Sequence, residues 1–199
     1  MQGTKGEILR TALELFACRG YEAVSVREIA GALGMTQGAL YRHYAGKRAI
    51  FESILEEMER RDARGARDFD LPEERPAAGE TACARCTPAR LEAYSRAQFR
   101  YWAKDEFAAL FRRMLTLEQY GSGEMNRLYQ QYLGAGPLEY TEELLRGMGA
   151  ARPRQRAAEL WGTLFLLLSV YDGTEKKNEV LALTEECLAA QSRTWTEEE

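Results

Sequence analysis

Apolar residues recur at intervals of three and four along most of the chain, the spacing that places side chains on one face of an α-helix. Residues 5–19 show it first, in the stripe Ile8, Leu9, Ala12, Leu13 and Phe16. Gly20 follows where a glycine often ends a helix. The pattern predicts a helix with one buried face at residues 5–19.

Two short helices joined by a turn are predicted between Ser25 and Lys47. Ser25 and Glu28 have the spacing of a capping box, which marks a helix N-terminus. Gly34 supplies the turn, and Thr36 can cap the next helix. The expected buried positions are Val26, Ile29, Ala30, Leu33, Leu40 and Tyr44.

The rest of the chain continues the helical pattern, with Ile and Val sparse and helix-forming residues frequent. Helices are expected at residues 47–67, 90–104, 106–120, 124–133, 138–148, 155–171 and 177–195. The Pro-containing segment from Asp68 to Pro88 is predicted to be a long surface loop. The helix at 155–171 is apolar around much of its circumference, so it is expected to bury more than one face. The fold class is therefore all-α, divided into residues 1–49 and 50–199.

Charge is unevenly distributed along the 199 residues. The net charge is −4, but residues 1–50 hold seven basic and four acidic residues, a balance of +3. A small basic N-terminal segment on an acidic body suits contact with a polyanion. This signal is weak by itself.

Several function classes find no support in the composition. His43 is the only histidine, which leaves little for a catalytic triad or a multi-histidine metal site. The longest apolar run, residues 164–168, is far short of the roughly 20 residues that span a membrane. Together with the absence of a signal-peptide pattern, this predicts a cytoplasmic protein. No cofactor, metal or catalytic residue is predicted.

The predicted loop contains the pair Cys83 and Cys86 in a C-x-x-C spacing. Such a pair can be half of a zinc site or a redox switch. The sequence offers no second C-x-x-C, so an inert reduced pair is the other interpretation. Both remain open.

The second helix of the Ser25–Lys47 unit has the chemistry for reading DNA. A helix in the major groove presents polar side chains near its N-terminus to base edges. Gln37, Gly38, Tyr41 and Arg42 lie opposite the buried Leu40. Glutamine can contact adenine in a bidentate manner, and glycine permits close backbone approach. Hydroxyls and free N–H groups at Ser25 and Thr36 suit phosphates, as does the ammonium of Lys47. A purely structural helical hairpin, with Tyr41 and His43 half-buried, is the alternative.

About residues 5–58 closely resemble the N-terminal domain of TetR-family transcriptional regulators. The matching pieces are ALELF, RGYEAVSV, REIAGALGM and TQGALYRHYAGKRAIF, in that order. The resemblance implies an all-α homodimer with three-helix DNA-binding domains and a helical effector-binding body. It assigns phosphate contacts to Ser25, Thr36, Tyr41, His43 and Lys47, and base contacts to Gln37 and Gly38. Arg42 is a further candidate base reader. Tyr44, where the family usually has Phe, is expected in the core.

The resemblance also implies a ligand pocket and a dimer interface in the body. The aromatic and methionine side chains there suit an adaptable apolar cavity, although any helical core would use them too. The candidate ligand contacts are Tyr94, Trp102, Phe107, Phe111, Met114, Tyr129 and Phe165. The candidate dimer contacts, in a four-helix bundle, are Leu160, Trp161, Leu164, Leu168, Leu181 and Leu188. Helices that only cap a monomeric core are the alternative.

The resulting hypothesis is a homodimeric, ligand-responsive repressor that binds a palindromic operator in double-stranded DNA and is released by a small-molecule effector. The aromatic content favours an apolar or planar effector, while acidic residues such as Asp105 or Glu118 could select a cation. Three alternatives remain: a helical enzyme, a metal- or thiol-responsive sensor that keeps the DNA-binding domain, or a partner-binding oligomer without DNA function.

Overall fold

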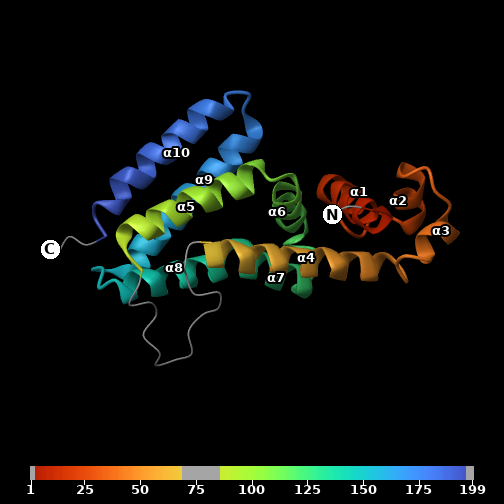
Figure 1. Cartoon of the computed structure of the whole chain (residues 1–199), viewed down its shortest axis with the longest axis horizontal. Helices are drawn as coiled ribbons and strands as arrows, with labels where there is room; N and C mark the ends of the chain where they lie inside the picture. Colours follow the sequence, from red (N-terminus) through yellow and green to blue (C-terminus); the bar gives the residue numbers. More distant parts are fainter. Residues whose placement is uncertain (1–2, 69–85, 196–199) are drawn as a thin grey trace. The chain divides into compact units, whose positions relative to one another are not determined.

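The computed structural model describes residues 3–68 and 86–195, without the side chains of 65–68. Within these ranges every regular element is a helix, which confirms the predicted all-α class (Figure 1). The helices are α1 (Thr4–Arg19), α2 (Val26–Ala32), α3 (Gln37–Tyr41), α4 (Lys47–Asp68), α5 (Pro88–Lys104), α6 (Glu106–Glu118), α7 (Gly123–Leu133), α8 (Ala135–Gly147), α9 (Pro153–Gly173) and α10 (Lys177–Ser192).

The chain divides into two compact units. The first contains the residues up to Arg61 together with Glu106–Tyr129, and the second contains Asp62–Asp105 with the residues from Gln130 onward. The first unit thus recruits α6 and the start of α7 to the N-terminal helices. The domain boundary predicted between residues 49 and 50 separates two expected functions and not two packing units. It stays a prediction.

The core of the first unit forms where α1 packs against α6. Ile8, Leu13 and Phe16 of α1 are fully buried, as the apolar stripe predicts. Phe111 and Met114 of α6 are equally buried. Burying side chains of this size contributes about 1.5–3 kcal/mol each, so this contact is a main source of the unit's stability.

Three polar links also join the segment from Glu106 to Glu124 to the N-terminal helices. Arg10 Nη2 lies 3.1 Å from Glu106 Oε1, and Arg48 donates two hydrogen bonds of 2.7 and 2.8 Å to the carboxylate of Glu124. The third link is a bond from the Tyr21 backbone to Glu118. These contacts hold α6 and the start of α7 on the same unit as α1 and the first part of α4.

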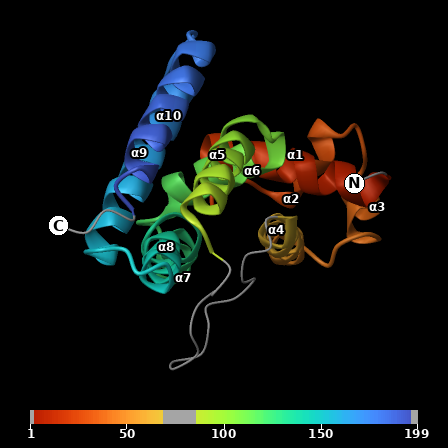
Figure 2. The same ribbon diagram turned by 60° about the vertical axis from the view of Figure 1, so that its left-hand side comes forward.

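The second unit is built around α9, which packs against α5, α8 and α10. Figures 1 and 2 both show α9 and α10 side by side. Trp161 of α9 donates a hydrogen bond of 2.9 Å from its indole nitrogen to the carbonyl of Leu133, which fixes its orientation. Beyond the end of α10, Trp195 is buried with 1% of its surface exposed, so it anchors the described C-terminal end.

The junction of α7 and α8 differs from the sequence-based expectation. The predicted helix at 138–148 begins earlier, at Ala135, so that only Gly134 separates the two helices. A Cβ at Gly136 would come within 2.2 Å of the carbonyl oxygen of Gln131. Gly136 therefore lies inside α8, where the absence of a side chain permits this close backbone approach.

The predicted loop from Asp68 to Pro88 is described only at its ends. Asp68 closes α4, while Thr87 accepts a hydrogen bond from the backbone of Arg90 at 3.3 Å and caps α5 before Pro88. Cys83 and the remainder of the loop lie outside the described residues. In the described part of the chain, no helix is long and apolar enough to cross a membrane.

Candidate functional site

The predicted capping box at the start of α2 is present in full. The Ser25 hydroxyl accepts a hydrogen bond from the Glu28 backbone at 3.2 Å, and the Glu28 carboxylate accepts one from the Ser25 backbone at 2.8 Å. Arg19 adds a contact of 2.6 Å to the same carboxylate. Hydrogen bonds from Ser25, followed by that from Arg19, lower the pKa of Glu28 to about 2. Glu28 therefore stays ionised and holds the entry to the two-helix motif.

The turn between α2 and α3 is set by Gly34 and Thr36. Gly34 has φ +64°, a left-handed conformation that glycine adopts readily. The Thr36 hydroxyl accepts a hydrogen bond from the Ala39 backbone at 3.1 Å and caps α3. Leu40 and Tyr44 are buried beneath it, as predicted. Local capping and two buried anchors thus orient a short helix.

Four predicted DNA-contacting residues come together on the exposed side of α3. Gln37, Gly38, Tyr41 and Arg42 are all exposed, and we call this set the recognition face. The Gln37 amide nitrogen lies 3.3 Å from the Tyr41 hydroxyl oxygen and donates a hydrogen bond to it. The Tyr41 side chain is 48% exposed. This exposure favours a binding role for α3 over a purely structural one.

The residues predicted to contact phosphates surround that face at different depths. Ser25 and Thr36 are exposed at the helix N-termini, while His43 is partly buried. Lys47 also makes contacts within the protein that the sequence did not predict. Its ammonium donates a hydrogen bond of 2.8 Å to the carbonyl of Tyr21 and lies 4.2 Å from the centre of the Tyr21 ring.

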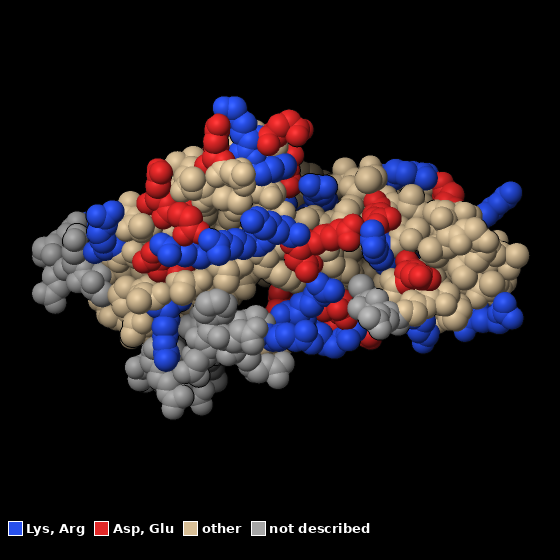
Figure 3. Space-filling model, turned by 45° about the horizontal axis from the view of Figure 1, so that its top comes forward, with Lys and Arg blue, Asp and Glu red and all other residues tan. Residues whose placement is uncertain are grey.

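Basic and acidic side chains are intermixed on the face of the molecule drawn in Figure 3. Many are paired along their own helices, as Arg48 is with Glu52 at 2.8 Å. Exposed pairs of this kind contribute little to stability. The excess of positive charge in residues 1–50 is therefore a weak signal in the structure, as it is in the sequence.

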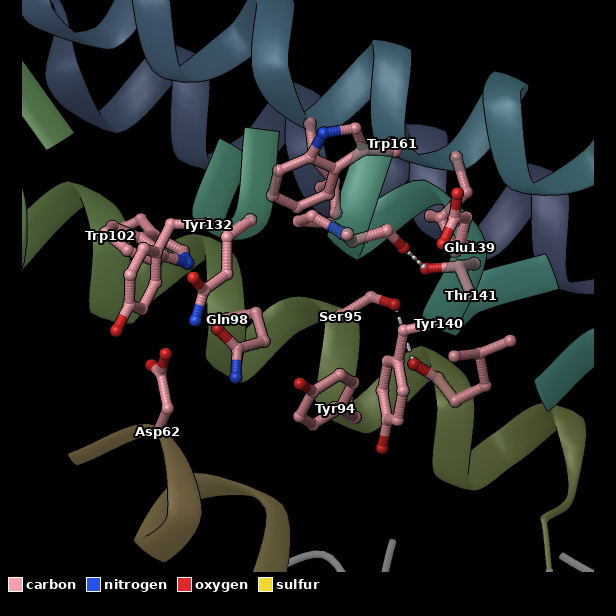
Figure 4. A pocket seen from close by; sticks show the side chains of 16 residues that line it. Asp62, Tyr94, Ser95, Gln98, Trp102, Tyr132, Glu139, Tyr140, Thr141 and Trp161 are labelled. Carbon is pink, nitrogen blue, oxygen red and sulfur yellow. Dashed lines mark hydrogen bonds between the residues drawn. The ribbon is translucent and has the colours of Figure 1, made fainter. Parts of the chain in front are cut away.

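The second unit contains a cavity of about 480 Å³. Figure 4 shows aromatic and polar side chains converging on it from α4, α5, α7, α8 and α9. Its lining consists of Asp62, Leu91, Tyr94, Ser95, Gln98, Trp102, Gln131, Tyr132, Gly136, Pro137, Glu139, Tyr140, Thr141, Leu160, Trp161 and Leu164. The size is typical of a small-molecule site.

The predicted ligand contacts are divided between the two units. Tyr94 and Trp102 line the cavity. Four others belong to the first unit, and Phe165 of α9 is partly buried outside the lining; the four are Phe107, Phe111, Met114 and Tyr129.

The prediction of ligand contacts missed the polar side chains of the cavity. Ser95 and Gln98 lie on the same stripe of α5 as Leu91 and Trp102, so polar residues in an otherwise apolar stripe were the available signal. Asp62 and Glu139 carried no such signal, because the loop and several helices separate them in sequence. Asp105 and Glu118, considered as selectors of a cation, are not among the lining residues.

The predicted dimer contacts are mostly internal to the chain. Leu160, Leu164, Leu168 and Leu188 are each at most 3% exposed, while Trp161 and Leu181 are partly exposed. The large exposed apolar side chains of α9 and α10 are Leu166, Val170 and Leu183. Dimerisation through these helices stays a prediction, and the residues available for it are this second set.

The cysteines and acidic residues in the described ranges form no cluster able to hold a metal ion. Cys86 is buried next to the start of α5, and its predicted partner Cys83 lies outside the described residues. The metal and redox interpretations of the C-x-x-C pair therefore stay untested.

Residues 8–54 match the sequence model of the bacterial regulatory proteins of the TetR family. The same region is 41% identical over 51 residues to the repressor KstR2 of Mycobacterium tuberculosis, covering 26% of each chain. It is 43% identical over 51 residues to the class C tetracycline repressor of Escherichia coli, covering 26% of this chain and 23% of that protein. The match thus spans about a quarter of the curated relatives' length.

Solved structures of low sequence identity share the fold over nearly the whole chain. FadR of Bacillus subtilis in complex with stearoyl-CoA superposes with a TM-score of 0.64 at 20% identity, covering 95% of this chain and 98% of that one. The SmeT–triclosan complex gives a TM-score of 0.65 at 20% identity, covering 95% and 91%; SmeT is the repressor of a multidrug efflux pump of Stenotrophomonas maltophilia. Residues 8–54 of this chain are thus similar to the bacterial regulatory proteins of the TetR family, and the chain shares the all-helical fold of these solved structures.

Proposed function

We propose that the protein is a homodimeric repressor that binds a palindromic operator through α3 and releases it when an effector fills the cavity of the second unit. The observation that carries this proposal is the exposed recognition face within the segment that matches the family. Curated relatives of that segment are repressors. The activities of these relatives as whole proteins are not transferred to this chain, because the match covers only the N-terminal region.

The recognition face supplies both kinds of contact that operator binding needs. Gln37, Gly38 and Arg42 are placed to reach base edges, and the Gln37–Tyr41 hydrogen bond limits the freedom of the glutamine side chain. Ser25, Thr36, Tyr41, His43 and Lys47 are the proposed phosphate contacts. So few base contacts per copy specify a short site, which is why the proposal requires two copies on a palindrome.

A second copy would cover the exposed side of α9 and α10. Leu166 is 62% exposed, Val170 44% and Leu183 46%. Ala158 and Gly162 continue the exposed stripe of α9 with small residues, which permit close helix approach. The palindromic symmetry of the proposed operator requires a twofold protein, and this face supplies a self-complementary apolar surface for it.

Effector release requires the cavity to influence the DNA-binding domain. One helix carries residues of both sites, because α4 contains Lys47 and the cavity residue Asp62. A second helix, α7, contains the cavity residue Tyr132 and Glu124, which accepts two hydrogen bonds from Arg48 of α4. An effector that binds more tightly to a conformation with displaced recognition helices lowers DNA affinity by that difference. The neighbours FadR and SmeT hold stearoyl-CoA and triclosan, respectively.

Selection of bound sequences from random duplexes tests the proposal directly. We expect a shared palindrome whose half-site centres lie about 34 Å apart, or a multiple of this, along the DNA axis. For Gln37→Ala we expect relaxed base preference at one position per half-site, with the helical content unchanged. Ala45→Ser, at an exposed position outside the recognition face, serves as the control. Recovery of no common sequence would overturn the DNA-binding function, and an unchanged preference would remove Gln37 from base reading.

A further inference from the structure

The recognition face contains a hydrogen bond between two side chains one helical turn apart. The amide nitrogen of Gln37 donates to the hydroxyl oxygen of Tyr41 at 3.3 Å. Residues four positions apart lie on the same side of a helix, so α3 brings the two groups together. Both side chains are exposed. The bond therefore lies on the surface that the proposed function places against DNA.

The backbone beneath this pair is held at its start and on its inner side. The Thr36 hydroxyl caps α3 by accepting a hydrogen bond of 3.1 Å from the Ala39 backbone, and Leu40 is fully buried. Because the helix turn is fixed in this way, the positions from which Gln37 and Tyr41 extend are set before DNA binds. Such preorganisation lowers the entropic cost of ordering side chains on binding.

The hydrogen bond leaves a defined set of groups on Gln37 for a ligand. A glutamine amide has two N–H donors and a carbonyl acceptor, and Tyr41 occupies one of the donors. Within the described residues, neither side chain makes another hydrogen bond. The remaining donor and the carbonyl complement the N7 acceptor and the N6 amine that adenine presents in the major groove. Guanine presents two acceptors at the same edge, so the carbonyl would meet no donor there.

The Tyr41 hydroxyl can accept and donate at the same time. Its oxygen accepts from Gln37, while its own proton rotates about the C–O bond towards a second acceptor. The proposed function gives Tyr41 a DNA phosphate as this second acceptor. Hydrogen bonds in a chain polarise one another, so a hydroxyl that donates to a charged group becomes a stronger acceptor. A phosphate bound to Tyr41 therefore strengthens its hydrogen bond with Gln37.

We propose that Tyr41 is a positioning residue for base recognition, which fixes the amide of Gln37 so that it reads an adenine in each half-site. The inference rests on the proposed function, in which α3 enters the major groove. A phosphate contact alone contributes equally on every sequence. The hydrogen bond instead makes the contribution of Tyr41 depend on the base that Gln37 meets.

Base discrimination measures this dependence. The position read by Gln37 is the one at which Gln37→Ala relaxes the selected operator, and duplexes with each of the four base pairs there are titrated with the full-length protein. The discrimination ratio is the affinity for the preferred duplex divided by that for the best of the other three. For the original protein we expect an A·T pair and a ratio of about 5 to 100.

Tyr41→Phe removes only the hydroxyl, and we expect it to lower the discrimination ratio about two- to tenfold, in addition to lowering affinity on all duplexes. A loss of affinity with an unchanged ratio would leave Tyr41 with a phosphate contact alone and overturn the proposal. A preferred G·C pair at this position would overturn it as well.

Two further variants assign the change in ratio to the hydrogen bond. Tyr44→Phe makes the same chemical change at a buried position of the same motif and should leave the ratio unchanged; an equal loss there would overturn the assignment. In the Gln37→Ala background, Tyr41→Phe should lower affinity on all duplexes without a further change in ratio, because its partner is absent. A further change would show that Tyr41 reads the base itself. Circular dichroism and unfolding midpoints check that each variant keeps the fold.

The titrations distinguish failure of the positioning role from failure of the proposed function. If a palindromic operator is selected but Tyr41→Phe leaves the ratio unchanged, the positioning role fails while DNA binding stands. If no operator is selected from random duplexes, the proposed function fails, and the positioning role fails with it.

Discussion

Glu118 and Tyr21 are 97 positions apart in the sequence, yet the Glu118 carboxylate accepts a hydrogen bond of 2.8 Å from the backbone N–H of Tyr21. The bond ties the end of α6 to the connection between α1 and α2. Because that connection leads directly to the capping box at Ser25, Glu118 supports the segment that positions the two-helix motif.

Removal of this carboxylate should loosen the α1–α2 connection. For Glu118→Ala we expect a loss of about 1 kcal/mol or more in the free energy of unfolding, since a partly buried N–H loses its acceptor. Operator affinity should fall as well. Glu118→Gln keeps an acceptor oxygen and should recover most of both. Denaturant unfolding and DNA titration check this, and equal behaviour of the alanine and glutamine variants would show that the hydrogen bond has no such role.

Gly20 should tolerate no side chain, in contrast to Gly31. Gly20 has φ +85°, and a Cβ there would lie 2.5 Å from the Glu118 carboxylate. We expect Gly20→Ala to lower the free energy of unfolding by about 1–2 kcal/mol. Gly31 is exposed within α2 and has open space around it, so Gly31→Ala should raise stability by about 0.5–1 kcal/mol. Thermal unfolding of both variants measures these changes. A Gly20→Ala protein as stable as the original would contradict the close contact between Gly20 and Glu118.

The capping box should make the N-terminal unit sensitive to acid. The pKa of Glu28 is lowered from 4.5 to about 2, so its ionised form is favoured by folding. Its contribution is fully present above pH 4.5 and is lost as the pH falls from about 4.5 towards 2. Glu28→Gln keeps the hydrogen-bonding shape without the charge and should flatten this part of the stability–pH curve. An identical curve for both proteins, measured by denaturant unfolding between pH 2 and pH 7, would exclude the effect.

Lys47 should have two separable roles. Loss of its ammonium removes the bond to the Tyr21 carbonyl, so Lys47→Ala should lower stability by about 1 kcal/mol. If Lys47 also contacts a phosphate, operator affinity should fall similarly on all sequences, and the salt dependence should become shallower by about one unit of slope. Titrations at several salt concentrations measure the slope. A destabilised variant with an unaltered slope would leave Lys47 with the structural role alone.

The exposed face of α9 should control assembly. Leu166→Glu places a charge at the proposed centre of the dimer contact, and we expect the dimer dissociation constant to rise at least about tenfold. Tyr120→Glu, at an 89% exposed position of the first unit, is the control and should leave assembly unchanged. Sedimentation over a range of concentrations gives the constants. A dimer unaffected by Leu166→Glu would place the interface elsewhere.

Features set by neighbours three or four residues apart were determined by the sequence itself. The buried stripe of α1, the capping box of Ser25 and Glu28, and the cap at Thr36 occur as predicted, because each depends on one turn of helix. The exposure of Gln37 and Tyr41 follows from the same periodicity once Leu40 and Tyr44 are buried. The resemblance to a known family rests on these local positions as well.

The cavity and the grouping of helices were decided by the tertiary structure. Asp62 and Glu139 line one space only because the end of α4, from Asp62 onward, belongs to the same unit as α8. Glu118 reaches Tyr21 only because α6 packs against α1. The apolar stripes of α6 and α9 do not determine which helix each will pack against, since any apolar face can pack against another. Phe107 and Phe111 thus became core of the first unit, while the polar Gln98 and Asp62 came to face the cavity.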